Sequence, residues 1–324
     1  MLKPPKSPAA ARSVEPFSSI DAVTAALATA NYISTPRIST AIYLARAMHK
    51  PVLIEGPAGV GKTDLAISVA AALEVKLLRL QCYEGLDDSK ALYEWKYGKQ
   101  LLYTQILKDK IGQIIDASDS LHDAFGKLNT FQDVFFSREF LEARPILQAM
   151  EQPDASVLLI DEVDKSEEAF EAMLLEVLGS NQITIPEIGT IRAAHPPLVL
   201  LTSNSTRELS DALKRRCLHL YIGFPDAALE RRIVQARIPD VSQHLLAQMV
   251  TFVQSVRAER LRKVPSVAET IDWARALILL NATTLDKTLI RDTLNVLMKR
   301  ESDIAALQEN LPGLAAAAIA ARSA

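Results

Sequence analysis

Short apolar runs alternate with amphipathic stretches before residue 225. Four of these runs are too short to form helices and predict buried strands. They lie at residues 51–54, 76–81, 157–160 and 198–201. Apolar residues at helical spacing lie between them, at residues 20–30, 38–48 and 64–73. Short apolar strands that alternate with helices predict an α/β fold, with a parallel sheet between two layers of helices.

The pattern changes after residue 225, where no further strand-like run occurs. Helical spacing predicts four more helices, at residues 226–236, 241–257, 266–281 and 285–308. Ser266 and Glu269 form an S-x-x-E capping box at the start of the third helix. Leu311, Pro312 and Gly313 should end the fourth. The sequence therefore predicts an all-helical domain after the α/β domain.

These patterns divide the chain into four expected segments. A flexible tail rich in Pro, Ser and Ala covers residues 1–19, and the α/β domain covers residues 20–225. The helical domain covers residues 226–310, and a C-terminal tail covers residues 311–324.

Composition narrows the class of protein. The 324 residues include 36 Lys and Arg against 39 Asp and Glu, and the net charge of −3 argues against a dedicated nucleic-acid binder. Two cysteines, Cys82 and Cys217, cannot make a disulfide framework. No apolar run approaches the roughly 18 residues of a membrane span, and the N-terminus has no secretory signal. We therefore expect a reduced cytoplasmic protein without a transmembrane segment.

The loop after the first predicted strand carries a phosphate-binding motif, G-x-x-x-x-G-K-[ST]. Its residues are Gly56, Pro57, Ala58, Gly59, Val60, Gly61, Lys62 and Thr63. Glycines let backbone N–H groups point inward at a helix N-terminus, where they bind phosphate. Lys62 is expected to reach the β- and γ-phosphates, and the Thr63 hydroxyl to bind Mg²⁺. A glycine-rich turn without a ligand is disfavoured, because the motif links a predicted strand to a predicted helix.

Polar residues follow two other predicted strands. Asp161 and Glu162 come after the run at 157–160, where a carboxylate suits a grip on Mg²⁺ and a second one can polarise water. Asn204 follows the run at 198–201, where its amide can orient water against the γ-phosphate. The simpler readings are a helix cap for the acids and a turn for Asn204. The phosphate loop favours the catalytic reading for all three.

Arg215 and Arg216 end a short predicted helix. Arginines there commonly serve the helix dipole or solvent. The catalytic alternative is an arginine finger supplied to the nucleotide of a neighbouring subunit, with Arg216 preferred and Arg215 second. No N-K-x-D sequence for reading guanine occurs, which favours ATP over GTP.

The order of these motifs resembles an AAA+ ATPase, and the chain is most similar to the MoxR family. Residues 158–165, 183–204 and 207–217 carry that resemblance. Within the family, residues 77–102 and 266–277 look like the branch associated with maturing the molybdenum–copper site of carbon monoxide dehydrogenase. Residues 83–140 resemble the insertion in the second helix that marks this group.

The resemblance implies a P-loop core with a helical lid, a homo-hexameric ring, and ATP and Mg²⁺ as ligands. Residues 56–63 correspond to Walker A, Asp161 and Glu162 to Walker B, and Asn204 to sensor 1. The implied partners are a separate protein with a von Willebrand factor A domain and a client metalloenzyme such as carbon monoxide dehydrogenase. The implied function is a chaperone that hydrolyses ATP to remodel this client during cofactor insertion. A motor acting on nucleic acid is the alternative.

Two features leave alternatives open. Many relatives carry an arginine, sensor 2, where this chain has Ala268, and Arg275 lies two helical turns further on roughly the same face. Arg275 is therefore the candidate replacement for nucleotide contact. The aromatic segment at residues 93–98 either packs in the core or forms a loop that faces a central pore and grips the client.

Overall fold

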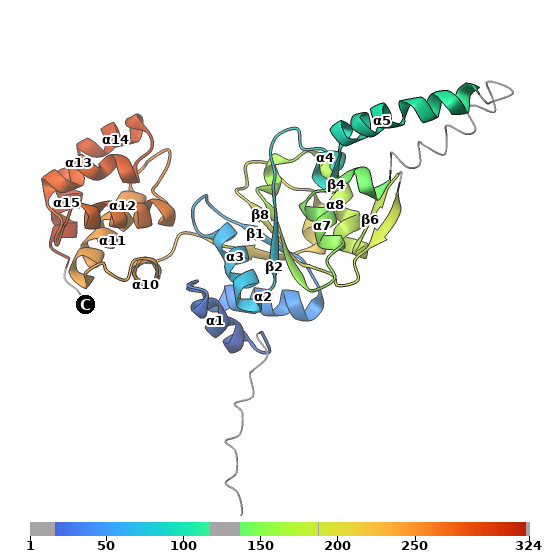
Figure 1. Ribbon diagram of the computed structural model, residues 1–324. Coiled ribbons are helices and arrows are strands. Elements are labelled where there is room, and N and C mark those ends of the chain that lie inside the picture. The colour runs from blue at the N-terminus through green and yellow to red at the C-terminus, as the bar shows by residue number, and fades with distance from the viewer. Residues whose placement is uncertain (1–16, 117–136, 187, 322–324) are drawn as a thin grey trace, which may run out of the picture.

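The computed structural model describes residues 17–116, 137–186 and 188–321. A five-stranded parallel sheet in the order β2-β5-β8-β1-β9 lies at its centre (Figure 1). Its strands are β1 (Val52–Glu55), β2 (Lys76–Gln81), β5 (Ser156–Asp161), β8 (Leu198–Ser203) and β9 (Leu218–Tyr221). The first four coincide with the apolar runs, so the prediction of a parallel α/β sheet is confirmed.

Helices bury both faces of this sheet, because side chains alternate along each strand. Val52 and Ile54 point into one apolar cluster and Leu53 into another. The first cluster is covered by α1 (Ile20–Thr29), α2 (Pro36–Met48) and α3 (Lys62–Leu73). The second is covered by α4 (Asp88–Leu92), α7 (Pro145–Met150), α8 (Glu168–Ser180) and α9 (Asp211–Arg216). Burial on both sides explains why these strands are continuously apolar.

The edge strand β9 has no counterpart among the predicted strands. It runs parallel to β1, with Val52 opposite Leu218. Only Leu220 of its four residues is fully buried. An edge strand in this position needs no continuous apolar run, so the periodicity gave no signal for it.

Two small antiparallel ribbons complete the α/β region. β3 (Tyr93–Trp95) pairs with β4 (Leu141–Ala143), and β6 (Gln182–Ile185) pairs with β7 (Gly189–Arg192). Tyr93 and Trp95 meet edge to face at 5.5 Å and pack against the core cluster of α7 and α8. The helix α5 (Tyr97–Asp116) then projects from this region (Figure 1). The rest of the expected insertion, residues 117–136, lies outside the described residues, as does most of the expected N-terminal tail. At the end of that tail, Phe17 is buried against the core.

The C-terminal helical region has an apolar core of its own, centred on the buried Trp273. Trp273 donates a hydrogen bond from Nε1 to Thr293 Oγ1 at 2.8 Å. The helices are α10 (Ala227–Arg237), α11 (Gln243–Ala258), α12 (Val267–Leu279), α13 (Lys287–Leu297), α14 (Glu301–Gln308) and α15 (Leu311–Ile319). The predicted capping box of Ser266 and Glu269 begins α12. In the described ranges, no helix is long and apolar enough to cross a membrane.

Two expectations for this region are wrong. The single helix at 285–308 is broken into α13 and α14, because Met298 turns into the core in extended conformation and Asp303 accepts hydrogen bonds from the backbone N–H groups of Arg262 and Lys263. No Gly or Pro marks this break in the sequence, because tertiary contacts cause it. The residues from Leu311 begin α15 instead of a tail, because proline is well suited to the first turn of a helix and the alanines at 315 and 318 pack into the core.

A buried ion pair ties three of these helices together. The Arg257 guanidinium on α11 binds both carboxylate oxygens of Glu230 on α10, each at 2.7 Å. Glu230 also accepts from Thr270 Oγ1 on α12 at 2.8 Å. The side chains of Glu230 and Arg257 are 0% and 7% exposed. Their mutual neutralisation is what permits two charges to lie in this core.

Arg257→Met should therefore lower the free energy of unfolding by about 3–5 kcal/mol, because it leaves the Glu230 carboxylate buried without its cation. Chemical denaturation of the purified protein measures this change. Arg291→Met is the matched control, since Arg291 pairs with Asp292 on the surface and should contribute less than about 1 kcal/mol. Equal stability of the two variants would contradict the structural role of the Glu230 pair.

Candidate functional site

The phosphate-binding motif forms the loop between β1 and α3. Gly56 and Gly59 have positive φ values of 150° and 73°. A Cβ atom on Gly56 would lie 2.0 Å from the backbone oxygen of Ile222, so the close approach of these chains requires glycine. Gly61 caps α3, and the helix N-terminus therefore opens directly onto the loop. This is the geometry of an anion site at a helix N-terminus.

Lys62 is buried at the centre of this loop. Its ammonium donates to the backbone oxygens of Gly56 and Pro57 at 2.6 and 2.7 Å, and to Asn204 Oδ1 at 2.7 Å. Burial lowers the pKa of Lys62, although the three nearby carboxylates of Asp164, Asp161 and Glu162 oppose this shift. The carbonyl and amide oxygens thus hold Lys62 at the mouth of the loop, where phosphate oxygens would bind.

Asp161 ends β5 beside the motif. Its carboxylate accepts hydrogen bonds from Thr63 Oγ1 at 3.0 and 3.1 Å and from Thr202 Oγ1 at 2.5 Å. The Thr63 hydroxyl and the Asp161 carboxylate are hard oxygen ligands of the kind that Mg²⁺ prefers. The two groups that the sequence assigned to the metal therefore lie together, and their chemistry fits it.

Glu162 follows Asp161 with a left-handed backbone, at a φ of 58°. Three donors hold its carboxylate: Asn204 Nδ2 at 3.2 Å, Gln81 Nε2 at 2.9 Å and Lys165 Nζ at 2.6 Å. A non-glycine residue in this conformation costs about 1–3 kcal/mol and persists where its surroundings impose it. Here the turn directs Glu162 out of the sheet and beside Asn204.

Asn204 bridges the two catalytic candidates. Its amide oxygen accepts from Lys62 and its amide nitrogen donates to Glu162, which fixes the orientation of the amide. Asp164, which the sequence reasoning did not select, holds the backbone of this segment. It accepts from the N–H groups of Asn204 and Thr206 at 3.2 and 2.9 Å, and from Thr206 Oγ1 at 2.6 Å. Burial opposes ionisation of Asp164, but the hydrogen bonds from Thr206 and Asn204 outweigh it and lower the pKa.

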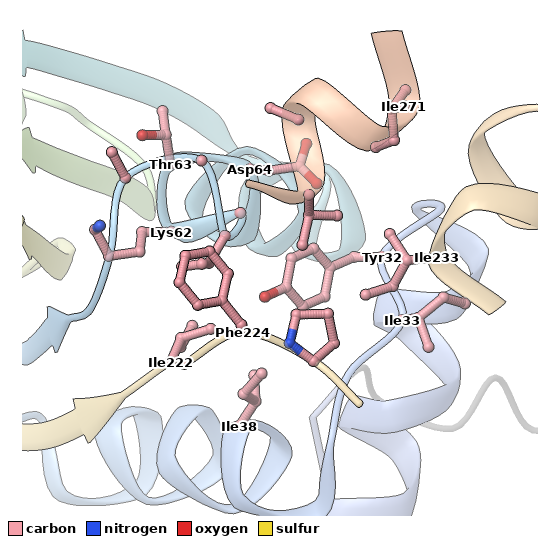
Figure 2. Close-up of a pocket in the computed structure, with 18 of the residues that line it drawn as sticks. Tyr32, Ile33, Ile38, Lys62, Thr63, Asp64, Ile222, Phe224, Ile233 and Ile271 are labelled. Atoms are coloured by element: carbon pink, nitrogen blue, oxygen red, sulfur yellow. The ribbon is translucent and has the colours of Figure 1, made fainter. Parts of the chain in front are cut away.

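A pocket of about 630 Å³ extends from this cluster between the α/β core and the helical region. Figure 2 shows its apolar part, which lies beyond Lys62 and Thr63. The residues there include Tyr32, Ile33, Ile38, Phe224, Ile233 and Ile271. Burial is the main cause that raises the pKa of the Tyr32 hydroxyl, and the nearby Asp64 carboxylate raises it further, so the hydroxyl stays neutral. A polar end for phosphates and an apolar end for a base is the combination that a nucleotide requires.

The helical region touches the phosphate loop directly. The backbone N–H of Ala268 at the start of α12 donates to Gly59 O at 3.2 Å. Arg237 on α10 pairs with Asp64 in the first turn of α3. The sequence reasoning did not select this ion pair, because charged residues 173 positions apart carry no local signal. Arg275 also lines the pocket, but its side chain is largely exposed and pairs with Asp272.

The two arginines of α9 lie apart from this cluster. Arg215 and Arg216 are exposed and do not line the pocket of their own chain. Arg216 donates to the carbonyl of Ala212 at 3.2 Å, and its Nε lies close to Gly179 on α8. The structure therefore brings together Lys62, Thr63, Asp161, Glu162 and Asn204, and leaves the arginine pair at the surface.

Comparisons with known proteins agree with this geometry. The family described as "AAA domain (dynein-related subfamily)" matches residues 51–217, which run from the start of β1 to the end of α9. Gas vesicle ATPase GvpN1 of Halobacterium salinarum is 26% identical over 285 residues, which cover 81% of this chain and 72% of that protein. An uncharacterised protein of Staphylococcus epidermidis is 21% identical over 237 residues, 71% of this chain and 76% of that protein.

Among solved structures, a mutant of Thermotoga maritima RuvB is similar with a TM-score of 0.46 and 18% identity. The match covers 86% of this chain and 79% of that one.

Asp164→Asn should lower the turnover of nucleotide about ten-fold, because an amide nitrogen in place of one carboxylate oxygen faces donors without accepting from them and releases the segment that holds Asn204. Nucleotide affinity should stay unchanged, since Asp164 does not itself line the pocket. Steady-state kinetics and equilibrium binding measure the two quantities. Asp154→Asn, in the exposed loop before β5, is the control. An unchanged turnover number would remove Asp164 from this positioning role.

Proposed function

The chain belongs to the AAA family, in its dynein-related subfamily, and we propose that it acts as a chaperone that uses ATP hydrolysis to remodel a partner protein. The enzymatic activity is ATP hydrolysis, which agrees with the AAA family and with the similarity to the gas vesicle ATPases. One observation carries the proposed catalytic role: five groups from three strand ends converge within hydrogen-bond distance at the polar end of the pocket. They are Lys62, Thr63, Asp161, Glu162 and Asn204.

In this proposal each side chain has one task. Lys62 and the backbone N–H groups of the loop bind the β- and γ-phosphates, and Asn204 orients the attacking water. Glu162 accepts a proton from that water as its oxygen bonds to the γ-phosphorus and the bond to the β–γ bridging oxygen breaks. ADP and inorganic phosphate are the products. The hydrogen bond between Asn204 and Glu162 supports this division, because it sets both groups beside one reacting water.

Thr63 and Asp161 would hold Mg²⁺ in the same site. Bound there, the ion would neutralise negative charge on the phosphates. The buried Asp161 carboxylate and the adjacent Thr63 hydroxyl support this assignment.

A second subunit would complete the site. We propose that Arg216 acts as an arginine finger toward the nucleotide of a neighbouring chain in a homo-hexameric ring, with Arg215 as the second candidate. Its exposure, away from the pocket of its own chain, is what an arginine supplied in trans requires. Arg275 lines the pocket on the lid side and is our candidate for the task of sensor 2.

The division into an α/β core at residues 20–225 and a helical lid that begins at residue 226 is part of this proposal, and the lid extends past the expected boundary at residue 310 to include α15. Separate apolar clusters for the sheet and for the C-terminal helices support it, as do the few polar links at Gly59 and Asp64. ATP hydrolysis in the pocket between the core and the lid would change the angle between these two parts, and this change would alter the conformation of the ring. We also propose a cytoplasmic location, with which the free cysteines Cys82 and Cys217 are compatible.

The proposal also names a class of client protein. The MoxR-like segments at residues 77–102 and 266–277 suggest a metalloenzyme such as carbon monoxide dehydrogenase, with a separate von Willebrand factor A-domain protein as partner. The alternative, a motor on nucleic acid, is disfavoured by the net charge of −3. A basic stretch at residues 257–263 begins with Arg257, whose charge is neutralised by the buried Glu230.

Glu162→Gln should bind ATP with normal affinity but release phosphate at least about 100-fold more slowly, because the amide cannot accept the proton of water. Phosphate release and binding of a fluorescent ATP analogue measure the two steps. Glu168→Gln, an exposed glutamate at the start of α8, is the matched control. Undiminished turnover in Glu162→Gln would exclude this residue as the base.

Specific ATPase activity should rise with protein concentration, because a neighbouring chain completes each site. Light scattering on the same samples reports the size of the particle. Equal amounts of Lys62→Ala and Arg216→Ala, each inactive alone, should recover activity when mixed, since about a quarter of head-to-tail interfaces then combine an intact site with an intact finger. Arg215→Ala in place of Arg216→Ala tests the second candidate. Full activity from a monomer would overturn the ring mechanism.

A further inference from the structure

The edge strand β2 sends two polar side chains toward the two acids at the end of β5. Arg79 and Gln81 alternate with the buried Leu78 and Leu80, so both project from the same side of the strand. Gln81 lies opposite Asp161 in the parallel register of β2 and β5. The strand therefore brings a cation and an amide to the carboxylates of the catalytic centre.

These side chains form a continuous chain of contacts. Arg79 Nη2 donates to Asp161 Oδ2 at 2.7 Å and to Gln81 Oε1 at 2.9 Å. Gln81 Nε2 in turn donates to Glu162 Oε2 at 2.9 Å. The chain thus links the carboxylate assigned to Mg²⁺ with the carboxylate assigned to the attacking water, through Arg79 and Gln81.

The position of Arg79 conflicts with a metal ion at the same carboxylate. Asp161 is almost fully buried, and Arg79 is the cation with which it pairs in the described part of the chain. A divalent ion on Asp161 would face the guanidinium across a single carboxylate, where two cations repel one another strongly. The Arg79 side chain is 48% exposed, so it can withdraw into solvent without losing a buried environment.

We propose that Arg79 is a positioning residue that competes with Mg²⁺ for Asp161. While Arg79 occupies Asp161, it also donates to Gln81, which in turn donates to Glu162. Binding of Mg²⁺ to Asp161 would displace Arg79 and break its hydrogen bond to Gln81. This inference rests on the proposed ATP site, and goes beyond it by assigning a role to a residue outside the phosphate loop and strand ends.

The test measures how much Mg²⁺ strengthens nucleotide binding. The dissociation constant of a fluorescent ADP analogue is measured with EDTA and with saturating Mg²⁺. The constant in EDTA divided by the constant in Mg²⁺ is then compared between variants. In Arg79→Gln this ratio should rise about ten-fold, since a full charge in contact with a carboxylate shifts its equilibria by one or more powers of ten. Arg79→Lys keeps the positive charge and should stay close to the wild-type ratio.

Arg144→Gln is the matched control. Arg144 is 49% exposed, close to the 48% of Arg79, and pairs with Glu94 on the surface away from the phosphate loop. Its ratio should equal that of the wild type. Thermal denaturation of each variant checks that the fold is intact, and if Arg79→Gln unfolds, Arg79→Ala and Arg79→Met provide the charge-free comparison.

Each outcome is decisive. A ratio in folded Arg79→Gln that equals the wild-type ratio would overturn the competition between Arg79 and Mg²⁺, and leave the ATP site standing. A rise of the same size in Arg144→Gln would also overturn it, because the effect would then be one of general charge. Failure of the wild-type protein to bind the analogue under either condition would overturn the proposed ATP site and this inference together.

Discussion

β1, β5 and β8 pair in parallel, in a register that keeps their carboxyl ends level. Ile54 lies beside Thr202, and Ile160 beside Leu201, so that the next residues of β5 and β8 also meet. The phosphate loop follows β1 directly, Asn204 follows β8, and the acid pair spans the end of β5. Because side chains alternate along a strand, a shift of one residue in any pairing would turn the candidate catalytic groups to the wrong face. The chemistry of this protein therefore depends on burial of apolar strands that carry none of it.

The charged groups of the candidate catalytic site compensate one another. The carboxylates of Asp161, Glu162 and Asp164 lie close to Lys62, which burial alone would favour as a neutral amine. Arg79 and Lys165 neutralise two of these acids from the edge of the site. Acids at low exposure are stable only when cations or hydrogen-bond donors compensate them. The protein supplies these from its own side chains, and each such contact is one that phosphates and metal would compete with.

The C-terminal helices have a core of their own but also contact the α/β region. Trp273 and the pair of Glu230 with Arg257 give them a core of their own. Among the described residues, few polar contacts join them to the candidate phosphate-binding loop, one of which is the backbone hydrogen bond from Ala268 to Gly59. A rigid unit attached through few contacts can rotate as a body when those contacts change. This arrangement suits a device in which nucleotide state sets the angle of a lid.

The sequence by itself determined the α/β class, the strands at β1, β2, β5 and β8, and the polar groups that follow three of them. These depend on local properties: apolar runs of strand length, glycines in a phosphate loop and acids at strand ends. Tertiary structure alone decided that β9 joins the sheet and that α13 and α14 are separate helices, because an edge strand and a packed turn need no local signal. It also decided that Asp164 holds Asn204 and that Arg79 reaches Asp161. These contacts join residues 40 and 82 positions apart, and only the packing of strands brings them within hydrogen-bond distance.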